Sequence, residues 1–351
     1  MTLWTPSQIA TSLWLDASDN TTFPNGSSNG AQVTIWKDKS GNSLDAFQTG
    51  GTGCPTITTN SLNSLSGVSF VSSNSQYLNF PQPFHGTTPR SIFVVASLTT
   101  LNTVNLIFSL GYATTIIYGT IFDFSVESSQ IAIRVYGNSL YSITNNTNSH
   151  DIFECLWASG NISTATVFKN GNIISRTGGV DTSVNTSSQT YGSLGYSPTQ
   201  GLHYLNGKIY EVILLNSTAN TQIRQYIEGY LAWKWGLEAN LSIDHPYYSA
   251  APTIVSSNLN SSGGIILGGL SSISPFFNPS LVSKGGIILG GSSNILAHDI
   301  TFIPERVAIT PQEAIYKAAQ KNSKYLYTVT EEKYLYSTSD STYKAEVVDG
   351  H

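Results

Sequence analysis

Ionised side chains are scarce in this chain. Only 11% of its 351 residues are Asp, Glu, Lys or Arg, whereas about 25% is usual for a soluble domain. The formal net charge is −5 and there is no block of basic residues, so nucleic-acid binding through phosphate neutralisation is not expected. A weakly charged surface repels its neighbours little. The composition therefore indicates either burial in an assembly or a polar secreted or surface domain.

Long apolar runs are missing and cysteines are few. No stretch approaches the roughly 18 apolar residues of a membrane-spanning helix, so no membrane span is expected. Residues 1–7 contain neither the basic region nor the apolar core of a secretory signal. The two cysteines are Cys54 and Cys155. Without a secretory signal, we expect two reduced core thiols rather than a disulfide.

Signatures of catalysis are also missing. None of the six histidines has metal-ligand spacing of the His-Glu-x-x-His kind, and no phosphate-binding loop occurs. Glycoside hydrolysis needs two carboxylates about 5–10 Å apart. Asp123 and Glu127 share one face of a predicted strand, but four residues of strand separate them by roughly 13 Å. We therefore expect no enzymatic activity and no cofactor.

Short strands dominate what is present. About a dozen segments are alternating or continuously apolar and are separated by Gly, Asn and Ser at roughly ten-residue intervals, the pattern of an all-β sandwich or barrel. Residues 165–175 form the clearest hairpin, because Asn170-Gly171 suits a type I′ turn. A final strand over 207–215 precedes one amphipathic helix, predicted at about 219–235.

The last hundred residues differ in character. Ser-Gly-Gly-Ile-Ile-Leu-Gly-Gly at 262–269 recurs, with Lys in place of Ser, at 284–291. Two copies are fewer than the roughly three that a free-standing solenoid needs. We therefore expect extended pieces that add to the edge of another surface; a flexible linker is the alternative. A short helix over 311–320 and a hairpin of 325–329 with 334–337 complete a predicted arm. The expected interaction residues are Ile265, Ile266, Leu267, Ile287, Ile288 and Leu289.

Four segments carry a family resemblance. They read Leu-Trp-Leu-Asp-Ala-Ser at 13–18, Trp-Lys-Asp-Lys-Ser-Gly-Asn at 36–42, the strand 207–215, and Gly-Tyr-Leu-Ala-Trp-Lys-Trp-Gly-Leu at 229–237 with His-Pro-Tyr at 245–247. In order and spacing they resemble concanavalin A-like, laminin G-like jelly-roll domains, in the branch common in phage and large-virus structural proteins. The resemblance implies a jelly-roll β-sandwich with one closing helix over 1–249, followed by the C-terminal extended arm over 250–351.

Together these features predict a non-enzymatic structural protein of a virion, a minor capsid or capsid-associated component. It would bind other virion proteins through its sandwich surface and its arm. The alternative is a carbohydrate-binding module at a virus or cell surface. An exposed ladder of Trp or Tyr beside a groove would favour this alternative. We expect most of the six tryptophans to lie in the core, because aromatic side chains bury large areas.

Two further kinds of site are predicted. Laminin G-like domains often bind calcium, and the candidate ligands are Asp16, Asp19 and Asp38, whose carboxylates at loop entrances suit this ion. Turn formation by the same side chains is the alternative that we favour. Eight Asn-x-Ser/Thr sequons are candidate glycosylation sites if the chain is exposed to the enzymes that attach glycans. They are Asn20, Asn25, Asn145, Asn161, Asn185, Asn216, Asn240 and Asn260.

Overall fold

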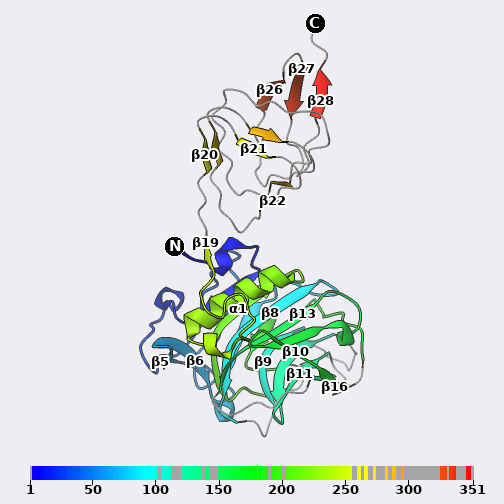
Figure 1. The fold of residues 1–351 in the computed structure, drawn as a ribbon. Helices are drawn as coiled ribbons and strands as arrows, with labels where there is room; N and C mark the ends of the chain where they lie inside the picture. Colours follow the sequence, from blue (N-terminus) through cyan, green and yellow to red (C-terminus); the bar gives the residue numbers. More distant parts are fainter. Residues whose placement is uncertain are drawn as a thin grey trace. The chain divides into compact units, whose positions relative to one another are not determined.

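The chain folds into two compact units. The computed structural model describes residues 2–100, 104–111, 120–135, 139–141, 149–179, 181–188, 191–198 and 203–254, together with short strands between 259 and 348. One unit comprises Trp4–Pro252, and the other comprises Met1–Leu3 with Thr253–His351. The first unit is an all-β sandwich of two antiparallel sheets with one helix (Figure 1).

One layer of the sandwich is an eight-stranded antiparallel sheet. Its order is β15-β14-β13-β8-β18-β6-β5, and β2 pairs separately with β18. Strand β8 is buried along its whole length, as a continuous apolar run between two covered faces predicts. The bounds are β15 (Asn172–Ile174), β14 (Thr166–Lys169), β13 (His150–Trp157), β8 (Arg90–Leu98), β18 (Gly207–Leu215), β6 (Leu65–Phe70), β5 (Thr56–Leu62) and β2 (Leu13–Asp16).

The other layer is a nine-stranded antiparallel sheet. Its order is β16-β12-β11-β10-β9-β17-β7-β4-β3. Along its strands, apolar residues that face the core alternate with residues on the outer face. The bounds are β16 (Arg176–Gly179), β12 (Ser139–Tyr141), β11 (Gln130–Arg134), β10 (Phe122–Glu127), β9 (Asn105–Leu110), β17 (Tyr191–Leu194), β7 (Leu78–Pro81), β4 (Ala46–Phe47) and β3 (Ile35–Trp36).

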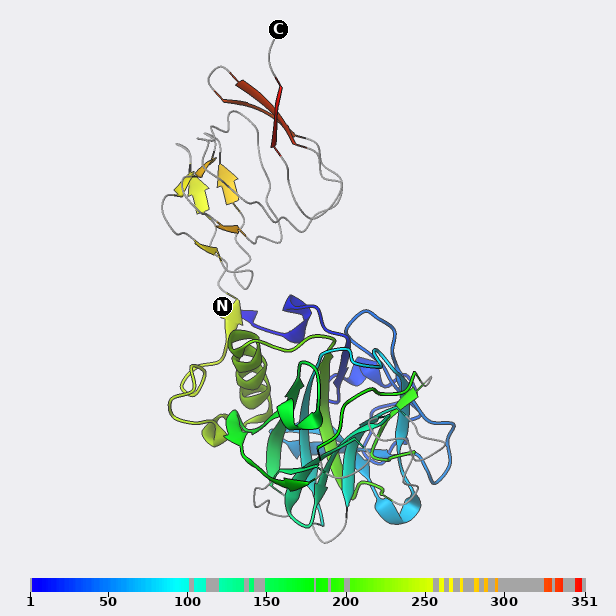
Figure 2. The same ribbon diagram turned by 90° about the vertical axis from the view of Figure 1, so that its right-hand side faces the viewer.

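The main core lies between these two sheets (Figure 2). Phe124 from the nine-stranded sheet meets Phe153 from the eight-stranded sheet edge-on, with ring centroids 6.2 Å apart. Burying each such ring contributes about 1.5–3 kcal/mol. Cys54 and Cys155 are both buried and free, as the sequence predicts.

Helix α1 (Thr221–Trp235) covers the outer side of the eight-stranded sheet (Figure 1). It begins where the Asn220 side chain accepts a hydrogen bond from the Ile223 amide and ends at Gly236, whose φ of 68° is the left-handed conformation of a helix C-cap. No helix among the described residues is long and apolar enough to cross a bilayer. The 3-10 turns are η1 (Pro6–Gln8), η2 (Asn20–Thr22), η3 (Ser72–Asn74), η4 (Ile162–Thr164) and η5 (Glu238–Asn240).

In the second unit the duplicated segments pair with each other. Three two-stranded parallel sheets join residues 22 positions apart, among them Ile265 with Ile287 and Leu267 with Leu289. The strands of the two copies therefore pair in register, and their addition to the edge of another surface stays a prediction. The bounds are β20 (Leu259–Ser261), β23 (Leu281–Ser283), β21 (Ile265–Leu267), β24 (Ile287–Leu289), β22 (Ser272–Ile273) and β25 (Asn294–Ile295).

The other described segments of this unit are also strands. β1 (Thr2–Leu3) pairs with β19 (Thr253–Ile254). The predicted hairpin is present as β26 (Tyr325–Val329) and β27 (Glu332–Tyr336), and β28 (Ala345–Val348) extends it to three antiparallel strands. The helix predicted over 311–320 lies outside the described residues.

Candidate functional site

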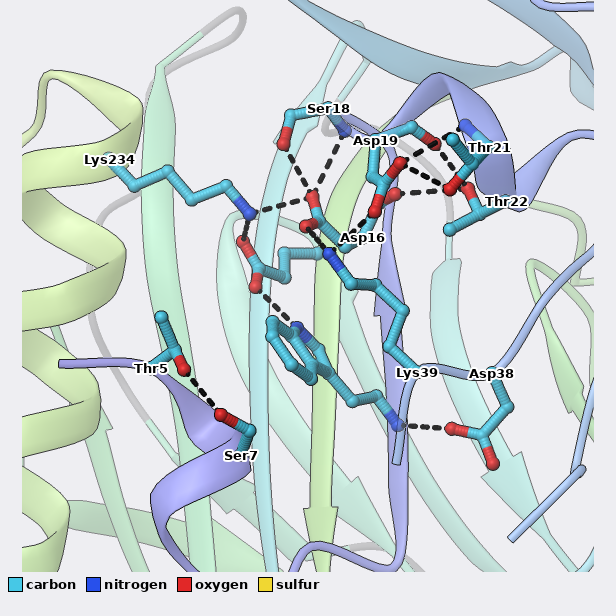
Figure 3. Close-up of polar contacts among 12 residues, drawn as sticks. Thr5, Ser7, Asp16, Ser18, Asp19, Thr21, Thr22, Asp38, Lys39 and Lys234 are labelled. Atoms are coloured by element: carbon cyan, nitrogen blue, oxygen red, sulfur yellow. Dashed lines mark hydrogen bonds and ion pairs between the residues drawn. The ribbon is translucent and has the colours of Figure 1, made fainter. Parts of the chain in front are cut away.

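The three aspartates predicted to bind calcium are engaged by other groups (Figure 3). Asp16, the last residue of β2, lies 2.9 Å from the Lys39 ammonium and 2.6 Å from that of Lys234. Lys39 also contacts Asp19 at 2.8 Å. Burial alone would raise the Asp16 pKa, but Lys234 and the other donors outweigh it and hold the pKa below its ordinary value.

Asp38 stabilises the turn in which it lies. It accepts hydrogen bonds from the backbone amides of Trp14 and Ser40, at 2.9 and 2.8 Å. Among the described residues, no group of three or more His, Cys, Asp or Glu side chains is arranged to hold a metal ion. Calcium binding stays a prediction, while lysine pairing and turn formation account for the three carboxylates.

A buried glutamate joins helix α1 to the sheet. Glu211 on β18 is fully buried, and four donors surround its carboxylate. They are Trp14 Nε1, Lys234 Nζ and Trp235 Nε1, each at 2.7 Å, and the Tyr230 hydroxyl at 2.9 Å. Burial raises the Glu211 pKa, although Lys234 opposes the shift. No sequence pattern indicated this cluster, because Trp14 and Glu211 are distant in the chain.

Two acids also meet under the helix. Glu154 of β13 lies against Glu228 of α1, and both are fully buried. His245 Nε2 is 2.8 Å from Glu228 Oε2, and Arg224 pairs with the other oxygen. Burial, together with the Glu228 charge, raises the Glu154 pKa well above its ordinary value. Because neither carboxylate is exposed, no substrate can reach the pair in this structure.

A shallow pocket of about 570 Å³ opens beside the C-terminal end of α1. Its charged groups are already paired, since Lys169 Nζ lies 3.1 Å from Asp151 and the Asn170 amide donates to the same carboxylate. The lining residues are Leu62, Ser149, His150, Asp151, Lys169, Asn170, Gly236, Leu237 and Asn240.

The tryptophans form no exposed ladder. Five of the six are buried, and Trp233, the sixth, is half-buried and donates to the Tyr247 carbonyl at 2.8 Å. The prediction that most tryptophans belong to the core is therefore confirmed. The buried ones are Trp4, Trp14, Trp36, Trp157 and Trp235.

Half-exposed tyrosines gather instead on the nine-stranded sheet. Tyr196 and Tyr204 stack with ring centroids 4.8 Å apart and an interplanar angle of 15°. Tyr77 lies 5.1 Å from Tyr196 and 6.5 Å from Tyr204. All three side chains are partly accessible to solvent. We call these three residues the tyrosine cluster.

A buried polar network holds Tyr196 in place. Asp123 of β10 is fully buried and accepts hydrogen bonds from Ser109 Oγ at 2.5 Å and Ser197 Oγ at 2.9 Å. Ser193 Oγ donates to the Tyr196 carbonyl at 2.5 Å. Burial raises the Asp123 pKa to about 6, although its hydrogen bonds act in the opposite direction. The network fixes the backbone on both sides of the Tyr196 ring.

The same network lies on one cross-strand row. Strand pairing sets Asp123 opposite both Ser109 and Arg134, and Ser193 opposite both Ser109 and Asn79. Since the neighbouring strand residues belong to the core, this row lies on the outer face of the sheet. Glu127, further along β10, forms an ion pair with Arg134. Arg134 thus stands opposite Asp123 and pairs with Glu127, and the absence of catalysis by these two acids stays a prediction.

A second aromatic pair occupies the same face. Phe47 of β4 stands opposite Asn79 of β7, and Tyr191 of β17 stands opposite Pro81. The rings of Phe47 and Tyr191 meet edge-on at 5.2 Å. Tyr191 is 44% exposed, so this pair, too, is open to solvent.

The predicted sequons are accessible where the structure describes them. Six of their asparagines lie in described segments and all six are exposed. Asn145 falls outside the described residues, and Asn260 lies in β20. The exposed asparagines are Asn20, Asn25, Asn161, Asn185, Asn216 and Asn240.

Comparison with known proteins gives matches to solved structures alone. No protein-family model and no curated protein matches the chain. A mutant of the NanB sialidase from Streptococcus pneumoniae matches with a TM-score of 0.35 and 15% identity, covering 44% of this chain and 26% of that one. Trypanosoma rangeli sialidase in complex with sialic acid matches with a TM-score of 0.39 and 12% identity, covering 63% and 33%. At this similarity the matches carry no argument about activity, and the chain spans a third or less of these sialidases.

These findings contradict the prediction of a virion structural protein. The matched structures described above are sialidases rather than virion components. Strands of the two repeated segments pair with each other, and their binding to neighbouring subunits stays a prediction. The low charge and the duplicated segment misled the sequence interpretation, because a polar surface and a self-paired repeat produce the same pattern as an assembly protein.

Proposed function

We propose that this chain is a non-enzymatic carbohydrate-binding module at a cell surface or in the extracellular space. The sandwich would be a concanavalin A-like, laminin G-like jelly roll, which the closing helix after β18 supports. The single observation that carries the proposal is the stacked, half-exposed Tyr196–Tyr204 pair in the segment that follows β17. The six exposed sequon asparagines suit an extracellular setting.

The chemistry of sugars explains why this surface suits them. A pyranose ring has an apolar face of C–H groups and an edge of hydroxyls. The apolar face packs on an aromatic ring, and the hydroxyls require hydrogen-bonding partners. Tyrosine provides both an aromatic ring and a hydroxyl group in one side chain. Holding the rings in place through the buried Asp123 network lowers the entropy that binding would otherwise cost.

The positions of four buried acids support binding without chemistry. Glu154 and Glu228 are buried, Glu211 is fully buried under the helix, and Asp123 is fully buried beneath Ser197. A glycosidase needs two carboxylates that flank the bond being cleaved. None of these four groups can reach a ligand on the tyrosine cluster in this arrangement.

A glycan array followed by titration of the best ligand tests the proposal. We expect Tyr196→Ala and Tyr204→Ala each to weaken binding by about tenfold or more, as truncation of an aromatic anchor commonly does. Tyr196→Phe should retain binding, because the ring is kept. Tyr248→Ala is the matched control, since Tyr248 is also half-buried but lies after the helix.

Two outcomes would contradict the proposal. One is the absence of binding to every glycan on the array. The other is an equal loss in Tyr196→Ala and Tyr248→Ala. Intrinsic tryptophan fluorescence verifies folding of each variant, because all six tryptophans lie within the sandwich.

A further inference from the structure

Two separate aromatic groups lie along strands β7 and β17 of the nine-stranded sheet. The tyrosine cluster surrounds Tyr77, and the Phe47–Tyr191 pair lies beside Pro81, which is the cross-strand partner of Tyr191. Tyr77 and Pro81 are four residues apart along β7 and the residue before it. At a rise of about 3.4 Å per residue, Tyr191 lies about 13 Å from Tyr77 along the strand, and Phe47, which stands opposite Asn79, lies about 7 Å from it. This spacing exceeds the width of one sugar ring.

A polar side chain lies between the two groups. Asn79 is half-buried on the same face, opposite Ser193 on one side and Phe47 on the other. Its amide makes no hydrogen bond to another described residue. An amide offers both donors and an acceptor, which matches the hydroxyls of a sugar that spans the gap.

The surface between the groups is uncharged. Strands β4, β7 and β17 contain no Asp, Glu, Lys, Arg or His. The nearest acid of the row, Asp123, is fully buried, and Arg134 beyond it is paired with Glu127. A carboxylated or sulfated sugar on these three strands would lose hydration and gain no ion pair from them in return.

From this geometry we infer the class of ligand: an uncharged oligosaccharide long enough to lie across Asn79 and stack on both aromatic groups. This inference rests on the proposed carbohydrate-binding function. The tyrosine cluster is the primary contact, since three rings gather there, and the Phe47–Tyr191 pair is the second. A monosaccharide can occupy one group, whereas a chain engages both, and linking two weak contacts multiplies their effect.

The test uses the full chain and an array that sets uncharged oligosaccharides beside their sialylated, sulfated and uronic-acid counterparts. The best uncharged ligand is then titrated as a size series from monosaccharide to hexasaccharide. We expect affinity to rise by about tenfold or more within the series and then to level off. Tyr191→Ala and Asn79→Ala should abolish that rise, whereas Tyr196→Ala should weaken every member of the series.

The outcomes separate the two proposals. If Tyr196→Ala loses binding but chain length and Tyr191→Ala have no effect, the bridging inference is wrong and the carbohydrate-binding function stands. Preference for the anionic counterparts would likewise overturn the inference alone. If no glycan binds, both proposals fail. Ile173→Ala serves as the control, because Ile173 is 69% exposed and belongs to the other sheet.

Discussion

Replacing Asp123 with asparagine should stabilise the sandwich at neutral pH. The carboxyl is fully buried, and burial raises its pKa from the ordinary 3.8 to about 6. Asparagine has nearly the same shape and carries no charge. Its carbonyl can accept from one of the two serines, Ser109 and Ser197, and its amide can donate to the other, whose hydroxyl rotates to accept. The variant should therefore keep the network and remove the cost of a buried charge.

The magnitude follows from proton linkage. The Asp123 carboxyl binds its proton more tightly in the folded state than in the unfolded state. The contribution of Asp123 to folding stability is therefore greatest below about pH 4 and falls as pH rises through about 6. Each pKa unit corresponds to about 1.4 kcal/mol, so the shift from 3.8 to about 6 costs about 3 kcal/mol at neutral pH. Asp123→Asn should gain up to this amount near pH 7 and nothing near pH 3.5.

Denaturant unfolding at a series of pH values, followed by tryptophan fluorescence, measures this difference. The control is Asp244→Asn, which removes the same charge from an exposed position and should change stability by no more than about 0.5 kcal/mol. A pH-independent difference between Asp123→Asn and the unmodified chain would refute the reasoning. So would a destabilised variant at neutral pH. Glycan binding should survive, since the Tyr196 backbone keeps its anchors.

Two further predictions concern the acids beneath helix α1. Lys234→Met removes the cation shared by Asp16 and Glu211 and should destabilise the chain by about 3–5 kcal/mol at neutral pH, because the buried Glu211 loses its paired cation and Asp16 keeps Lys39 alone. Denaturant unfolding should show a smaller loss at acidic pH, where these groups take up protons, and an equal loss at both would count against the argument. Glu154→Gln should gain stability progressively as pH rises through the raised pKa of Glu154, since glutamine has no proton to lose. An unaltered pH profile of unfolding would show that the contact with Glu228 does not matter.

Local features of the fold could be predicted from the sequence. The Asn170-Gly171 turn adopts positive φ angles of 51° and 73°, as expected for a type I′ hairpin. The strand predicted over 207–215 is present with those bounds. The helix begins two residues later than predicted, at Thr221, because Asn220 provides the cap. The turn, the strand and the helix each depend on residues within a few positions of one another in the sequence.

The candidate site could not be predicted in the same way. Tyr77 and Tyr196 are far apart in the sequence and meet because β7 pairs with β17. Nothing local distinguishes Tyr196 from any other tyrosine in a turn. The duplicated segment was visible, but its composition does not say whether the copies pair with each other or with another chain. Both questions are decided by strand order, which short-range patterns leave open.

The first and last residues of the sandwich lie next to each other. The Trp4 amide donates a hydrogen bond of 2.9 Å to the carbonyl of Pro252. A domain whose N- and C-terminal ends are adjacent can be inserted into a surface loop of an unrelated protein without changing the backbone path of that protein. Its ends can equally be joined and new ones opened in an exposed turn such as 216–218. The sandwich is therefore suited to domain insertion and to circular permutation.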